Sequence, residues 1–178
     1  MVASINNKLI RRHPHVFSDA CYESESEQKE AWEALKAEER DDKHGHPQGR
    51  LSGIAQALPS LQRSVKLQKR AARAGFDWPN AGPVFDKIHE ELDELKHEID
   101  SNAPHERLQD ELGDILFAVT NLCRHLKVEP DSALRGTSLK FEQRFGYIEA
   151  QLAEQGKEME DCSLDELEVL WQAAKSAL

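Results

Sequence analysis

The chain has 178 residues, of which 39% are hydrophobic and 31% are charged, and its formal net charge at pH 7 is -10. This length suits one domain, and the acidic balance argues against general binding to nucleic acids or anionic membranes, because both need a cationic partner. The three cysteines form no CxxC pair, the N-terminus lacks a hydrophobic signal region, and no run reaches the roughly 18 apolar residues of a membrane span. We therefore expect a cytoplasmic protein that binds neither nucleic acid nor membrane.

The first part of the chain, residues 1–50, is expected to be a lead-in and linker with short helices. Ile5 to Arg12 has a helical pattern that His13-Pro14 would end, because proline disfavours the helical state in the preceding residue. A second short helix is expected from Ala31 to Arg40, followed by a linker rich in Asp, His, Gly and Pro. Residues 51–178 are expected to form the compact domain.

The compact part opens with a helix expected between Pro59, which suits a first turn, and Gly75, which suits a left-handed cap. Lys69 belongs to the basic side of this helix, which is either a solvated face or a set of cations that face phosphate groups. After the helix, Phe76 is expected to fold back as the apolar contact of the cap. Trp78 is less easily explained by a cap, and it could stack on a nucleobase.

The stretch from Phe85 to Leu126 predicts a helical hairpin. Apolar residues recur at three- and four-residue steps on both sides of a break at Ser101-Asn102-Ala103-Pro104, which is the period of an apolar helix stripe. The stripe of the first arm contains Phe85, Ile88, Leu92, Leu95 and Ile99, and that of the second contains Leu108, Leu112, Ile115, Val119, Leu122 and Leu126. We expect the two arms to pack stripe to stripe.

Four carboxylates flank these stripes. At about 100° per residue, Glu91 and Glu94 lie roughly 70° and 130° from the first stripe, and Glu111 and Asp114 lie roughly 60° and 120° to the same-handed side of the second. Flanks of the same hand meet along one edge of an antiparallel pair, and both pairs lie about ten residues from the break, at one height. Converging carboxylates repel one another unless protonated or bridged by a cation, and oxygen-only ligands suit Mg²⁺ or Mn²⁺. The pattern predicts a metal site, and the alternative is a solvated acidic face.

A long helix follows the hairpin. On its flank Lys140 and Arg144 lie one turn apart, so their charges point the same way. Gly156 is expected to end this helix, and Ser163-x-x-Glu166 is a capping box that opens the last one. On that last helix Trp171 falls on the apolar face and is expected to anchor the core.

The arrangement of Glu90-Glu91-x-x-Glu94 followed by Glu111-x-x-Asp114 resembles the MazG nucleoside triphosphate pyrophosphohydrolases. The likeness covers nearly the whole chain, but it begins where the first catalytic domain of the two-domain bacterial protein ends. We therefore expect the C-terminal catalytic domain together with its lead-in. Further matching stretches are Gln68-Lys69-Arg70, Gly75-Phe76-Asp77-Trp78, Asn121-Leu122 and Lys140-Phe141-Glu142-x-Arg144-Phe145.

The resemblance implies an all-α helical bundle that hydrolyses nucleoside triphosphates to monophosphates and pyrophosphate with Mg²⁺, for which Mn²⁺ could substitute. It implies metal binding by the four carboxylates, triphosphate binding by Lys140 and Arg144, and a place for Trp171 near the nucleotide. Ser138 stands where the family usually has an asparagine. Because contacts to phosphates and to a stacking face do not read base edges, we expect broad base specificity.

A homodimer is also expected, because the apolar stripes are longer than one hairpin and one flanking helix would easily cover, and because the family pairs two such subunits. Two other functions stay open. One is a base-selective dUTP or dCTP pyrophosphatase of the same superfamily, and the other is a non-catalytic helical module with a regulatory or partner-binding role.

Overall fold

The structure is a computed structural model that describes residues 6, 9–10, 13–18, 21–22, 24, 27–28, 31–32, 35 and 49–177. These described residues form helices and no strands, so the predicted all-α class is confirmed. The chain divides into two units, Met1–Ala55 and Gln56–Leu178. This division falls close to the boundary predicted between residues 50 and 51, and the role assigned to each part stays a prediction.

The first unit contains one short helix with defined ends, α2 (Pro14–Phe17), which begins at its proline. Close to it, Nε2 of Gln28 donates a hydrogen bond to Nε2 of His15 at 2.6 Å. The helices expected at Ile5–Arg12 and Ala31–Arg40 fall mostly outside the described residues. Those of their residues that are described are helical.

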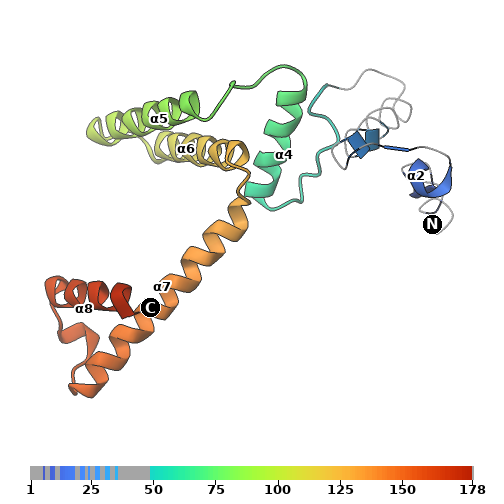
Figure 1. Ribbon diagram of the computed structural model, residues 1–178. Coiled ribbons are helices and arrows are strands. Elements are labelled where there is room, and N and C mark those ends of the chain that lie inside the picture. Colours follow the sequence, from blue (N-terminus) through green and yellow to red (C-terminus); the bar gives the residue numbers. More distant parts are fainter. Residues whose placement is uncertain are drawn as a thin grey trace. The chain divides into compact units, whose positions relative to one another are not determined.

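The second unit contains α4 (Ser60–Arg73), α5 (Gly82–Asp100), α6 (His105–His125), α7 (Pro130–Glu154), a 3-10 turn at Met159–Asp161 and α8 (Leu164–Ala177). The predicted hairpin is present as α5 and α6, and α4 packs against α6 and touches α7 (Figure 1). From there α7 leads away from the hairpin, and α8 folds back against its far half. None of the described helices is both long enough and apolar enough to cross a membrane.

The end of α4 is closed by backbone hydrogen bonds around a left-handed glycine. Gly75 has a φ of 86°, and the amides of Gly75 and Phe76 donate to the carbonyl oxygens of Ala72 and Ala71, each at 3.0 Å. This is the Schellman motif, so the predicted cap is confirmed. The contact predicted for Phe76 is wrong, because its side chain is 81% exposed. The two backbone bonds alone close the helix.

Three further helices end in the same way. Their left-handed residues are Asn102, Lys127 and Gly156, with φ values of 53°, 57° and 63°. Asn102 accounts for the predicted break in the hairpin, and Gly156 ends α7 as expected. The capping box of α8 is also confirmed, since the amide of Ser163 donates to Oε2 of Glu166 at 2.9 Å and the amide of Glu166 donates to Oγ of Ser163 at 3.3 Å.

The second unit has a small apolar core. Its buried hydrophobic residues are Val84, Ala118, Ile148, Leu152 and Ala174. The one buried residue of α4 is polar: Gln68 donates from Nε2 to the carbonyl oxygen of Phe117 at 2.8 Å. The predicted stripes are only partly covered, because six of their members remain between 39% and 56% exposed, namely Phe85, Leu92, Ile99, Leu112, Val119 and Leu126. One chain does not bury the stripes of its own hairpin.

Candidate active site

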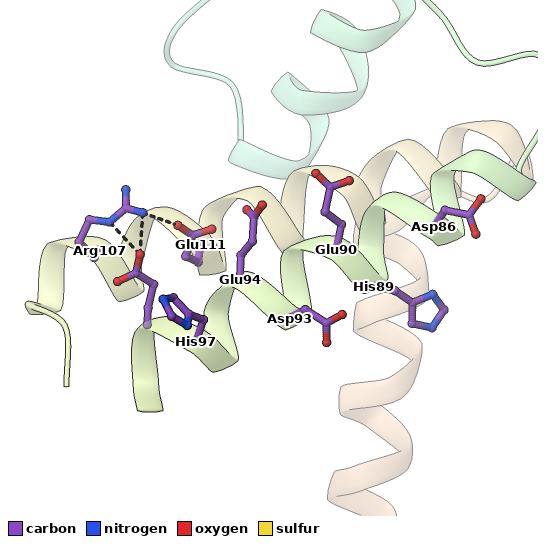
Figure 2. Close-up of a pocket in the computed structure, with 9 residues that line it drawn as sticks. Asp86, His89, Glu90, Asp93, Glu94, His97, Arg107 and Glu111 are labelled. Carbon is purple, nitrogen blue, oxygen red and sulfur yellow. Dashed lines mark hydrogen bonds and ion pairs between the residues drawn. The ribbon is translucent and has the colours of Figure 1, made fainter. Parts of the chain in front are cut away.

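Three of the four predicted carboxylates gather where α5 meets α6. One oxygen from each of Glu91, Glu111 and Asp114 lies within 4.8 Å of the others. Glu91 and Glu111 are 5% and 6% exposed, whereas Asp114 and Glu94 are exposed, in the order that their angular positions predict. Glu94 lies outside the group of three, but it lines the same pocket as Glu111 (Figure 2). The fourth predicted ligand is therefore beside the cluster and not within it.

Glu111 has one satisfied and one unsatisfied oxygen. Its Oε1 accepts a hydrogen bond from Nη2 of Arg107 at 3.0 Å, while its Oε2 is buried and has no partner among the described residues. Burial raises the pKa of Glu111, the charges of Glu94 and Glu91 raise it further, and Arg107 opposes them. A buried polar atom without a partner destabilises a fold unless a ligand satisfies it. This oxygen-only cluster could therefore bind a metal ion, and a hard divalent cation suits it best.

Two cationic side chains, Lys87 and Arg107, form ion pairs with the cluster. Each lies one helical turn before the buried carboxylate that it pairs with. Nζ of Lys87 lies 2.8 Å from Oε1 of Glu91, and hydrogen bonds to Glu91 and then to Glu90 raise the pKa of Lys87. Arg107 holds Glu111 in the same way (Figure 2). The sequence interpretation missed both cations. The spacing of i and i+4 between opposite charges on a helix was the signal that could have found them.

The predicted phosphate-binding residues form a second group, which we call the α7–α8 group: Lys140, Arg144 and Trp171. The guanidinium carbon of Arg144 lies 5.7 Å from the centroid of the Trp171 ring. The same ring packs against Phe141 with centroids 5.4 Å apart, so its place as an anchor between α7 and α8 agrees with the prediction. Lys140 is exposed one turn before Arg144.

The α7–α8 group does not meet the carboxylates within one chain. The pocket at the carboxylates is lined by residues of α5 and α6 only. Lys140 and Arg144 lie on α7, which leads away from this hairpin, and Trp171 lies on α8, which packs against the far half of α7 (Figure 1). The two halves of the predicted site therefore lie apart in a single copy of the chain.

Trp78 and Lys69 also lie outside the carboxylate pocket. Trp78 is 38% exposed, and its amide donates to Oδ1 of Asp77 at 2.9 Å. Asp77 is held in turn by α6, where Nη1 of Arg124 donates to its Oδ2 at 2.9 Å. Lys69 is exposed on α4. Nucleotide binding by these two residues stays a prediction.

The fold and the cluster together define an all-α domain that presents converging carboxylates on a helical hairpin. Residues 84–147, which contain α5, α6 and much of α7, match the family model of the MazG nucleotide pyrophosphohydrolase domain. This segment of the chain is therefore similar to that domain. All four predicted carboxylates lie within the matched segment, as do Lys140 and Arg144.

Similar proteins match almost the whole chain. It is 44% identical over 174 residues to a nucleoside triphosphate pyrophosphohydrolase of Escherichia coli (strain K12), in an alignment that covers 97% of this chain and 65% of that protein. It is 39% identical over 175 residues to the nucleoside triphosphate pyrophosphohydrolase/pyrophosphatase MazG of Thermotoga maritima, in an alignment that covers 98% of this chain and 64% of that protein. It is 41% identical over 176 residues to the uncharacterized protein YabN of Bacillus subtilis, in an alignment that covers 98% of this chain and 35% of that protein. The chain thus spans less than two thirds of the length of these relatives.

Proposed function

We propose that this chain hydrolyses nucleoside triphosphates to nucleoside monophosphates and pyrophosphate in a reaction that depends on Mg²⁺. The observation that carries the proposal is the cluster of Glu91, Glu111 and Asp114, in which a buried oxygen of Glu111 has no partner among the described residues. Bound Mg²⁺ would supply charge neutralisation at the phosphoryl oxygens. The names of the Escherichia coli and Thermotoga relatives support the same reaction.

The buried and the exposed carboxylates have different roles in metal binding. Glu91 and Glu111 are buried and each is ion-paired through one oxygen, so both carboxylates are held in place before any ligand arrives. Glu94 and Asp114 are exposed at the rim and complete the ligand set from the side that the triphosphate reaches. Mn²⁺ has the same preference for oxygen donors and would substitute.

The α7–α8 group supplies positive charge for the triphosphate. Lys140 and Arg144 bind the triphosphate, and the contact of Arg144 with Trp171 limits the directions in which its guanidinium can point. Trp171 offers a ring face near the phosphates. Neither a cation nor a ring face reads base edges, so the broad base specificity predicted from the sequence follows from the same residues.

We further propose that two copies form the working site, with the α7–α8 group of one copy over the carboxylates of its partner. Two observations support this: α7 leads away from the hairpin of its own chain, and Phe85, Leu92 and Leu112 remain about half exposed on that hairpin. Apolar surface of this extent needs a cover, and a second copy of the chain provides one. Light scattering should give twice the chain mass of 20.2 kDa, and the mass of a single chain would count against the dimer.

Pyrophosphate release from the eight common ribo- and deoxyribonucleoside triphosphates tests the reaction. We expect release from all eight with Mg²⁺, none with EDTA, and none from a Glu111→Gln control purified in parallel. A preference above about a hundredfold for one base, nearly 3 kcal/mol, would instead indicate a dUTP or dCTP pyrophosphatase. No release from any nucleotide would refute the proposal and favour a non-catalytic module.

A further inference from the structure

Each buried carboxylate of the cluster shares its cation with a second, more exposed carboxylate. Nζ of Lys87 lies 2.8 Å from Oε1 of Glu91 and 2.9 Å from Oε1 of Glu90. The side chain of Glu91 is 7% exposed and that of Glu90 is 56% exposed. Nη2 of Arg107 lies 3.0 Å from Oε1 of Glu111 and 2.7 Å from Oε1 of Glu98. The side chain of Glu111 is 7% exposed and that of Glu98 is 18% exposed. Each cation therefore has one partner inside the cluster and one outside it. Lys87 finds both on its own helix α5, whereas Arg107 on α6 reaches across the hairpin to Glu98 on α5.

The cations and a metal ion compete for the same carboxylates. The Lys87 ammonium occupies Oε1 of Glu91, and Arg107 occupies Oε1 of Glu111. A divalent ion bound to these carboxylates would repel both cations at short range. Without a metal, the same cations offset the repulsion between two buried carboxylates.

We propose that Lys87 and Arg107 are resident counter-cations of the cluster, and that binding of a divalent metal transfers them from Glu91 and Glu111 to Glu90 and Glu98. The inference rests on the metal site proposed above and concerns how that site is kept charge-balanced. Lys87 and Arg107 are positioning residues in this scheme, because they act through the carboxylates that bind the metal. Glu90 and Glu98 are the receiving carboxylates, which lower the cost of displacing each cation.

Mg²⁺ affinity by calorimetry, measured on the full chain without nucleotide, tests the proposal. Lys87→Met removes the charge but keeps a side chain of similar reach, so we expect it to bind Mg²⁺ about three- to tenfold more tightly than the wild type. The same variant should melt at a lower temperature in EDTA, because Glu91 then lacks its partner. Lys87→Arg keeps the charge and should retain wild-type affinity. If Lys87 only maintained the fold or the orientation of Glu91, Lys87→Met would bind Mg²⁺ equally or less tightly, and the proposal would be overturned.

The receiving role of Glu90 is tested by a double-mutant cycle. Glu90→Gln should weaken Mg²⁺ binding about threefold in the wild-type background but have no effect when Lys87→Met is also present, since no cation then needs a second partner. A simple loss of negative charge would weaken binding equally in both backgrounds, and this result would overturn the receiving role. Asp93→Asn is the matched control, because Asp93 lines the same pocket and makes no ion pair with another described residue. Its effect should be the same in both backgrounds.

The outcomes separate this inference from the proposed function. If the wild-type chain shows neither heat of Mg²⁺ binding nor a shift in melting temperature, the metal site is wrong and the inference is wrong with it. If the wild type binds Mg²⁺ but Lys87→Met does not bind it more tightly, the metal site stands and the counter-cation role is refuted.

Discussion

A mixture of two inactive variants can reveal whether one active site is built from two copies of the chain. Glu111→Gln damages the carboxylate cluster, and Arg144→Ala damages the α7–α8 group. If the carboxylates of one copy work with the α7–α8 group of its partner, each variant homodimer contains two sites with one defect each. A heterodimer of the two variants instead has one site with both defects and one site with none.

The symmetry of a two-fold dimer gives the expected magnitude. Random association of equal amounts yields about one half heterodimer, and half of the sites in each heterodimer are intact. The mixture should therefore regain about a quarter of the wild-type rate of pyrophosphate release, and purified heterodimer about half. The variants are refolded together with different affinity tags, so that subunit exchange can be measured by pull-down.

Mixing Glu111→Gln with Asp114→Asn is the matched control. Both residues belong to the same cluster of the same chain, so no pairing of these variants creates an intact site. The mixture should stay inactive although its subunits exchange. If the Glu111→Gln and Arg144→Ala mixture also stays inactive despite full exchange, each chain uses its own α7–α8 group and the two-copy site is refuted.

Four substitutions test single residues. Glu94→Gln and Asp114→Asn should each abolish pyrophosphate release without lowering the melting temperature in EDTA, because both side chains are exposed and their neutralisation relieves repulsion; turnover at the wild-type rate would contradict their role as ligands. Lys140→Ala should raise KM for the triphosphate while Mg²⁺ affinity by calorimetry stays unchanged, and weakened Mg²⁺ binding would contradict its separation from the cluster. Asp77→Asn should destabilise the fold at pH 7 by about 1–2 kcal/mol in urea unfolding, because Arg124 loses a partner in a partly buried ion pair. Since hydrogen bonds from Arg124 lower the pKa of Asp77, this stabilisation is fully present above the unfolded value of about 4 and is lost as pH falls through the folded value. The difference should therefore close in acid, and a difference that persists there would show that the charge is not its cause.

The parts of the fold that the sequence predicts well depend on neighbouring residues. Gly75 and Gly156 are found at left-handed caps because few other residues adopt that backbone conformation without strain. The capping box of α8 joins residues three positions apart. The burial order of the carboxylates follows from the helical repeat alone, which places Glu91 and Glu111 nearer the stripes than Glu94 and Asp114.

The parts that the sequence does not predict depend on distant contacts or on an absent surface. Gln68 is buried because it reaches the backbone of Phe117, and no pattern within α4 indicates this. The local sequence indicates only that Asp77 lies in a loop, although its side chain forms an ion pair with Arg124 on α6. The predicted stripes assume that α5 and α6 cover each other, but Leu92 and Leu112 remain about half exposed, since periodicity identifies an apolar face and not the element that covers it.

The connection between α6 and α7 has a consequence for the topology of the domain. It runs only from Leu126 to Glu129, and it holds Lys127 in the left-handed region at a φ of 57°. A tight hinge of this kind limits the directions in which the next helix can leave, and short strained hinges favour the exchange of an element with a neighbouring molecule. Insertion of several flexible residues after Lys127 would let α7 turn back along its own hairpin. This loop, far from any reacting group, would then decide whether the chain forms a self-contained monomer or an intertwined pair.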